Sequence, residues 1–123
     1  MDTSACRWPL LLLAMLLPGL SAADWSSAEA ALDRAALMRD EARAAGAERL
    51  AEEAMESARY HYFIARHACL RREFVTCEIE ADRAHADARL AQVEAQRVQA
   101  EQATAAVDAE VKRLNDQLAQ QGG

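Results

Sequence analysis

The chain has almost no proline or glycine beyond its N-terminal segment. Both prolines, Pro9 and Pro18, precede Asp24, and Gly46 is the only glycine between Asp24 and the terminal pair Gly122-Gly123. Because these two residue types are the commonest helix breakers, their scarcity predicts long helices with few interruptions. No segment alternates apolar and polar residues with a period of two, and we therefore predict an all-α fold without strands.

A concentrated positive face is also missing. The 14 Lys and Arg residues are spread along the sequence among 20 Asp and Glu residues, for a net charge of −6. Nucleic acids and anionic membrane surfaces attract proteins through clustered positive charge. We therefore expect neither nucleic acid nor an anionic membrane surface among the partners.

Catalytic and cofactor motifs are absent from the sequence as well. It has no glycine-rich phosphate loop and no serine in a nucleophile-elbow context. Its carboxylates stand beside arginines as on a solvated helix face, for example in Arg49-x-x-Glu52-Glu53. We expect a protein that is not an enzyme and that uses no cofactor.

The N-terminal segment has the three parts of a cleavable signal peptide. Arg7 supplies positive charge, residues 10–17 form an apolar core, and Pro18-Gly19 ends it. Ser21-Ala22-Ala23 offers small residues to signal peptidase, which predicts cleavage between Ala23 and Asp24. The alternative, an uncleaved anchor, is disfavoured because the apolar run is far shorter than the ~20 residues that span a bilayer. No cysteine follows the run at a lipidation position, so we expect a soluble mature chain with no membrane span after cleavage.

Alanine dominates the remaining sequence. It makes up about a quarter of residues 24–123, whereas aromatic residues make up 5% of the whole chain. Alanine buries little apolar area, so the core of this single domain, residues 24–121, is expected to be thin. Residues 122–123 are expected to form a disordered tail.

Three stripes of small residues, spaced alternately by three and four, predict helices at about 27–45, 47–70 and 74–118. The first is expected to begin after Ser26 or Ser27 as N-cap, with Glu29 close behind. The stripes change phase at Gly46, which predicts a turn, although an unbroken helix through Gly46 is the alternative. They change phase again across residues 70–73, which predicts an antiparallel hairpin with the first helix alongside. The stripes are Ala28, Ala31, Ala35, Met38, Ala42 and Ala45; Ala47, Ala51, Ala54, Ala58, His61, Ala65 and Ala68; and Phe74, Cys77, Ala81, Ala84, Ala88, Ala91, Ala95 and Val98.

The third helix is predicted to outlast its partners. From Phe74 to Leu118 it would span roughly 68 Å, well beyond the second helix. Its large apolar groups need a cover, so we expect self-association as a coiled coil or, alternatively, the helix of another protein. This later stripe consists of Leu90, Val93, Ala100, Val107, Val111, Leu114 and Leu118.

Two cysteines and two histidines recur at intervals of eight residues, at His61, Cys69, Cys77 and His85. If the chain folds back near residue 73, the cysteines face each other and the histidines face each other. The two levels would then lie ~12 Å apart, too far for one four-ligand metal site. We predict a Cys69–Cys77 disulfide, and leave as alternatives two small buried thiols or a weak metal site that includes His67.

Most aromatic residues of the helical part gather beside the predicted hairpin turn, at Tyr60, Tyr62, Phe63 and Phe74. On a helix, Tyr60 and Phe63 point one way and Tyr62 another. They therefore serve either as packing at the hairpin end or as an exposed docking patch.

Two Ala-rich stretches, ARAAGAERLA at 42–51 and DRAHADARLA at 82–91, resemble a family of small helical envelope domains of unknown function in Gram-negative bacteria. These domains occur alone or ahead of an OmpA-like peptidoglycan-binding domain. Arg72-Glu73-Phe74 stands where members carry a Gly-Asp-Tyr-like turn, and the resemblance extends from about Ala28 to Ala100. The chain departs from the family in having neither a lipidation cysteine nor an OmpA-like domain. The resemblance implies an envelope location and no known activity.

Together these features favour a non-enzymatic helical scaffold or protein-interaction module in the periplasm of a Gram-negative bacterium. It would bind an envelope protein or itself through the third helix. The alternative function is a metal-binding or redox-responsive periplasmic protein that uses Cys69, Cys77 and nearby histidines.

Overall fold

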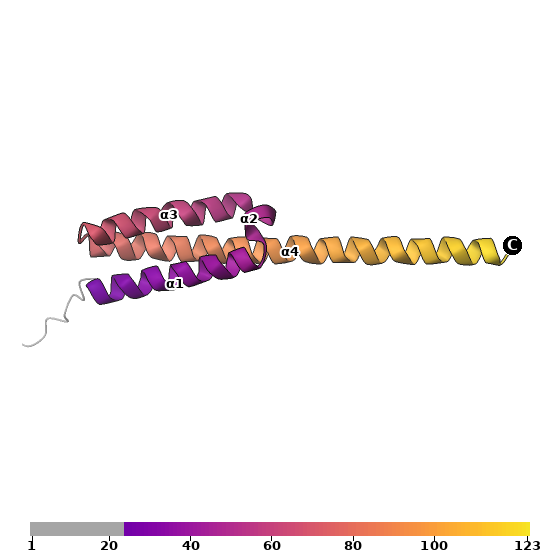
Figure 1. Cartoon of the computed structure of the whole chain (residues 1–123), viewed down its shortest axis with the longest axis horizontal. Coiled ribbons are helices and arrows are strands. Elements are labelled where there is room, and N and C mark those ends of the chain that lie inside the picture. The colour runs from indigo at the N-terminus through magenta and orange to yellow at the C-terminus, as the bar shows by residue number, and fades with distance from the viewer. Residues whose placement is uncertain (1–23) are drawn as a thin grey trace, which may run out of the picture.

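The computed structural model describes residues 24–123, which form four helices (Figure 1). In chain order these are α1 (Trp25–Ala44), α2 (Ala47–Leu50), α3 (Glu52–Leu70) and α4 (Phe74–Gln121). No strand occurs within this range, so the predicted all-α fold with a long C-terminal helix is confirmed. The predicted signal peptide, including Ala23 at its cleavage site, lies outside the described residues.

Helix α1 begins earlier than the sequence pattern predicted. Its N-cap is Asp24, whose Oδ1 accepts a hydrogen bond of 2.9 Å from the Ser27 backbone N–H. The predicted N-caps, Ser26 and Ser27, are therefore wrong, because both lie within the first helical turn. A carboxylate caps a helix as well as a serine hydroxyl does, and its negative charge also favours the positive end of the helix dipole.

A turn at Gly46 separates α1 from α2, as the change of phase predicted. Gly46 has a left-handed φ of 80°, a conformation that costs glycine nothing but strains other residues. This geometry excludes the alternative of an unbroken helix through Gly46. Across the turn, Glu48 accepts hydrogen bonds from Arg43 and Arg59, at 3.1 and 3.0 Å, and so links α1, α2 and α3. The bond from Arg43, followed by that from Arg59, holds the pKa of Glu48 below its usual value.

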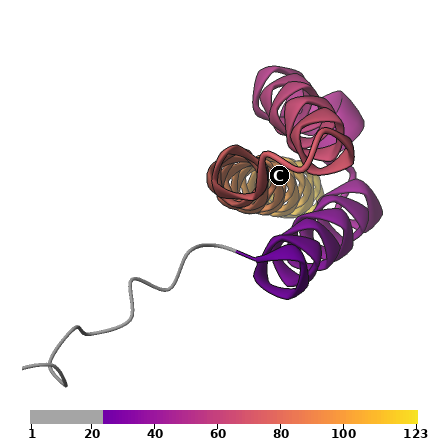
Figure 2. The ribbon, with the colours of Figure 1, turned by 90° about the vertical axis from the view of Figure 1, so that its left-hand side faces the viewer.

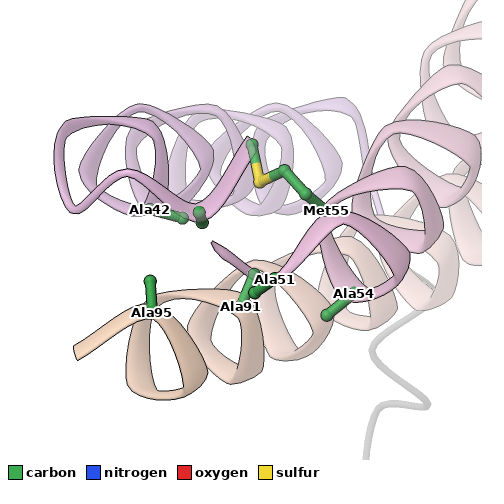
Figure 3. Packing of buried hydrophobic residues seen from close by; sticks show 7 residues of the cluster. Ala42, Ala51, Ala54, Met55, Ala91 and Ala95 are labelled. Carbon is green, nitrogen blue, oxygen red and sulfur yellow. The ribbon is translucent and has the colours of Figure 1, made fainter. Parts of the chain in front are cut away.

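The predicted single helix over 47–70 is interrupted at Ala51, which has φ −145° and ψ 52°. Ala51 itself is buried, and two consecutive buried residues, Ala54 and Met55, follow it at the start of α3. Met55 is fully buried, and Figure 3 shows it gathered with Ala42 of α1 and Ala91 of α4. The small-residue stripe runs through Ala51 without a change of phase, so the sequence pattern gave no sign of this bend, and the stripe did not include Met55.

The three long helices lie at the corners of a triangle when viewed along the bundle (Figure 2). Helix α4 packs against both α1 and α3, which contact each other less extensively. Nearly every alanine of the three predicted stripes is buried, whereas Ala45, His61, Phe74 and Val98 are only partly buried. Because alanine ends at its Cβ atom, helix axes with such seams can approach closely.

The α3–α4 connection is the tight turn predicted over residues 70–73. Helix α3 ends with Arg72 in a left-handed conformation, φ 61°. The Arg72 N–H donates to Cys69 O at 3.0 Å and the Glu73 N–H to Ala68 O at 2.9 Å. These two bonds are those of a Schellman motif, in which glycine usually occupies the position of Arg72. An antiparallel α3–α4 hairpin follows, and α4 continues past the predicted end at Leu118 to Gln121.

The alanine seam predicts a strong size limit at its centre. Replacing fully buried Ala84 by Leu should lower the free energy of unfolding by about 1–3 kcal/mol, because the closely packed helices leave no room for the larger side chain. Ala86 of the same helix is exposed, so Ala86→Leu is the matched control and should change stability little. Urea unfolding followed by circular dichroism measures both, and equal effects would contradict close packing at Ala84.

Candidate interaction surface

The distal half of α4 leaves the bundle. Its last hydrogen bond to another helix or turn comes from Gln99 Nε2, which donates to Ala45 O at 2.9 Å. Every residue from 99 to 123 is exposed, and Figure 1 shows this part of α4 extending alone beyond α1 and α3. A helix of this length without packing partners derives little stability from its own hydrogen bonds.

This distal segment carries four large apolar side chains on one face. Their spacings of four, three and four residues are those of a coiled-coil seam. We call this set the distal stripe; it consists of Val107 (62% exposed), Val111 (50%), Leu114 (45%) and Leu118 (65%). The predicted docking residues of α4 are thus all exposed and aligned.

The same face continues toward the bundle with two polar interruptions. Leu90 and Val93 are about half exposed, and Arg97 and Thr104 separate them from the distal stripe. Arg97 pairs with Glu101 at 2.6 Å, and the Thr104 hydroxyl donates to Ala100 O at 3.0 Å. The polar side chains are therefore satisfied along the helix itself, and the distal stripe is the one continuous large apolar segment of this face.

Acidic residues border the distal stripe on both sides. Asp108 and Glu110 stand beside the seam positions of Val107 and Val111. Glu110 accepts hydrogen bonds from Arg113, which lower the pKa of this carboxyl, and both side chains are solvent-exposed. A helix that covers the distal stripe must therefore accommodate negative charge at its edges.

The aromatic residues of the predicted docking patch lie on different sides of α3. Tyr60 and Phe63 are each 62% exposed on α3. Tyr62 is partly buried toward α1, where the Arg39 guanidinium lies 4.5 Å from its ring centroid. Tyr62 is therefore a packing residue, and its assignment to a docking patch is wrong. The Tyr62 side chain points away from Tyr60 and Phe63 because successive side chains on a helix are about 100° apart around its axis.

The two cysteines meet at the hairpin end of the bundle. Their Cα atoms are 5.2 Å apart and their sulfur atoms lie at disulfide-bond distance. Both side chains are buried, and an open hollow of about 460 Å³ lies next to Cys69. The hollow is lined by Trp25, Cys69, Leu70, Arg72 and Phe74.

The histidines do not share one site with the two cysteines. His61 faces Glu80, whereas His85 lies against Arg34 O of α1 at 3.3 Å, so the expectation that these histidines face each other is wrong. His85 occupies the side of α4 that packs against α1, not the side that meets α3. His67 stacks on Phe63 at 4.3 Å between ring centroids. Within residues 24–123, no three His, Cys, Asp or Glu side chains are placed to hold a metal ion together.

A polar cluster between α3 and α4 escaped the sequence analysis. Glu80, only 9% exposed, lies 2.6 Å from His61 Nδ1 and accepts a bond of 2.7 Å from Arg83. Ser57 lies one turn before His61 on α3, and its hydroxyl donates to Asp87 of α4 at 2.7 Å. Glu80 directly precedes Ala81, a residue of the predicted stripe, and this position was the only sign in the sequence that Glu80 could be buried. Both carboxylate oxygens of Glu80 have a hydrogen-bonding partner, one in His61 and the other in Arg83. Such partners stabilise a charge that is buried.

Comparisons with known proteins add no assignment, because the chain matches no family model, no curated protein and no solved structure. None of the helices in residues 24–123 has the length and apolarity needed to cross a membrane.

The disulfide predicts a measurable stability difference. Replacing Cys69 and Cys77 together by Ala should lower the free energy of unfolding by about 2.5 kcal/mol, because the bond closes a short loop in the unfolded chain. Urea unfolding of the oxidised protein and the variant measures this difference. In excess reductant, the wild-type protein should have the same free energy of unfolding as the variant. If reductant leaves the stability of the wild type unchanged, the Cys69–Cys77 bond is absent from the protein.

The polar cluster predicts that a buried carboxylate stabilises the α3–α4 interface. Glu80→Ala should destabilise the fold by about 1–3 kcal/mol, because His61 and Arg83 lose their shared acceptor. Exposed Glu56 of α3 provides the control, since Glu56→Ala removes an equal charge without a buried bond. If thermal unfolding shifts equally for both variants, the cluster contributes nothing specific.

Proposed function

We propose that this protein is a non-enzymatic helical scaffold or interaction module of the periplasm of a Gram-negative bacterium. The three-helix bundle serves as the folded base, and distal α4 serves as the contact element. The partner is an envelope protein or a second copy of the chain.

The distal stripe is the observation that carries this proposal. Val107, Val111 and Leu114 expose large apolar surface in a segment that lies beyond α1 and α3. Soluble proteins rarely expose such aligned groups unless a partner covers them. The coiled-coil spacing favours a helix as the covering element.

The periplasmic location is supported by the sequence rather than by the distal stripe. The predicted signal peptide directs export, and Asp24, the first residue after the predicted cleavage site, is the N-cap of α1. The Cys69–Cys77 geometry fits an oxidising compartment. The family resemblance points to the same envelope.

The alternative, a metal-binding or redox-responsive protein, needs free Cys69 and Cys77 thiols beside His67. Counting thiols in protein purified from the periplasm separates the two proposals. Absence of free thiols supports the scaffold with a disulfide, whereas two free thiols with stoichiometric zinc or copper would favour the alternative.

The scaffold proposal predicts the effect of removing distal α4. A chain that ends at Gln99 keeps its bond to Ala45 and should retain the bundle helices while losing association. Light scattering and chemical crosslinking in the native cell compare this chain with the full-length protein. An unchanged monomer mass for both forms, together with an unchanged set of crosslinked proteins, would overturn the proposal.

A further inference from the structure

We infer that distal α4 forms an antiparallel coiled coil with a second copy of this chain, with residues 104–121 of the two copies overlapping tail to tail. The inference rests on the proposed function, because it specifies what covers the distal stripe. One parallel pairing and two antiparallel registers differ in the charges and side-chain sizes that they bring together.

A parallel pairing places identical residues opposite each other. It matches Val107 with Val107 and Leu114 with Leu114, but its in-register extension brings Arg97 against Arg97 at the seam. Two arginines at one seam layer repel each other and must leave their bonds to Glu101 or point away. It also requires the two bundles to lie side by side.

One antiparallel register places Val107 of one copy opposite Val111 of the other. The leucines then oppose small or polar residues, with Leu114 against Thr104 and Leu118 against Ala100. The edges are unfavourable as well. In antiparallel coiled coils, like edge positions face each other, so Asp108 would face Asp108 and Glu110 would face Glu110.

Sliding the second copy by one heptad removes both defects. Val107 then opposes Leu118, and Val111 opposes Leu114, so all four residues of the distal stripe pack against large apolar partners. The ends of the overlap pair Thr104 with Gln121. This register buries the whole distal stripe in the shortest overlap.

The same register makes the edges compatible. Asp108 of one copy faces Asn115 of the other, and Glu110 faces Gln117. Each carboxylate thus meets an amide, which can donate a hydrogen bond, and not a second carboxylate. Charge and side-chain size therefore select this register among the antiparallel pairings, and the Arg97 layer and the side-by-side bundles disfavour the parallel direction.

This geometry keeps the two bundles apart. The overlap lies beyond Gln99, the last residue of α4 that bonds to the rest of the bundle. At ~1.5 Å per residue, the two Gln99 positions would be roughly 40 Å apart along the shared axis. The dimer is then a rod with one three-helix bundle at each end.

Crosslinking in the full mature chain tests the direction. Thr104→Cys and Gln121→Cys are prepared as separate proteins, since neither change removes a residue of the distal stripe. Mild oxidation of the mixture should give a Thr104→Cys/Gln121→Cys heterodimer. Thr104→Cys alone should give none, and efficient self-crosslinking of that variant would overturn the antiparallel arrangement.

A charge change at one edge tests the register independently. Gln117→Lys should tighten the dimer about fivefold, through two Glu110–Lys contacts, and Gln117→Glu should weaken it by a similar factor. Sedimentation equilibrium measures both, and added salt should reduce the difference. Gln102 lies on the outward face of the helix, so Gln102→Lys and Gln102→Glu control for net charge and should leave the dimer unchanged. Equal responses at 102 and 117 would overturn the register.

The two proposals fail in different ways. If the full chain stays monomeric at all concentrations, the self-pairing is wrong. Capture of an envelope protein that is lost on replacing Val111 and Leu114 by Gln would then still support the scaffold function. If neither self-association nor capture depends on these residues, both proposals fall.

Discussion

The fold depends on close approach of helices through alanine. At the centre of the bundle, Ala35, Ala65 and Ala84 meet from three helices and are all fully buried. Each contributes little apolar area, so stability must come from many such layers in register. This requirement explains why alanine recurs so regularly on α1, α3 and α4, and why a single enlarged residue cannot be absorbed by neighbouring side chains.

An alanine seam needs additional contacts at its two ends, because fewer alanine layers hold the helices together there. At one end, the Schellman turn and the Cys69–Cys77 pair join α3 to α4, and Trp25 contacts Phe74 across the opening with ring centroids 6.0 Å apart. At the other end, Met55 fills the space near the Gly46 turn, and Glu48 ties the helices through exposed ion pairs. Larger side chains thus close both ends of the alanine layers, and Met38, Leu32 and Tyr62 pack between the ends.

The sequence predicted which residues share a helix face much better than it predicted which helix packs against that face. Spacing alone identified the buried alanines and the turns at Gly46 and residues 70–73, because helical periodicity fixes which side chains share a face. It missed the bend at Ala51, the Glu80–His61 contact and the packing of Tyr62 against Arg39 of α1. These features depend on which helix lies opposite a given face, and a single helical stripe carries no such information. The Asp24 cap was missed because serine and aspartate compete equally well for that position.

Helix α4 uses different residue sizes for two different tasks. Apart from Cys77 and Glu80, its buried positions are alanines, the last of them Ala95, along the part that packs against α1 and α3. Beyond the bundle, valines and leucines appear on another face, starting with Val107. A seam between only two helices needs such larger knobs, because helix axes in a coiled coil stand 8–10 Å apart and alanine would leave the space unfilled. The change in size therefore argues against the distal segment as a mere extension of the bundle. Its residue sizes are those of a two-helix seam, which is the role that we propose for distal α4.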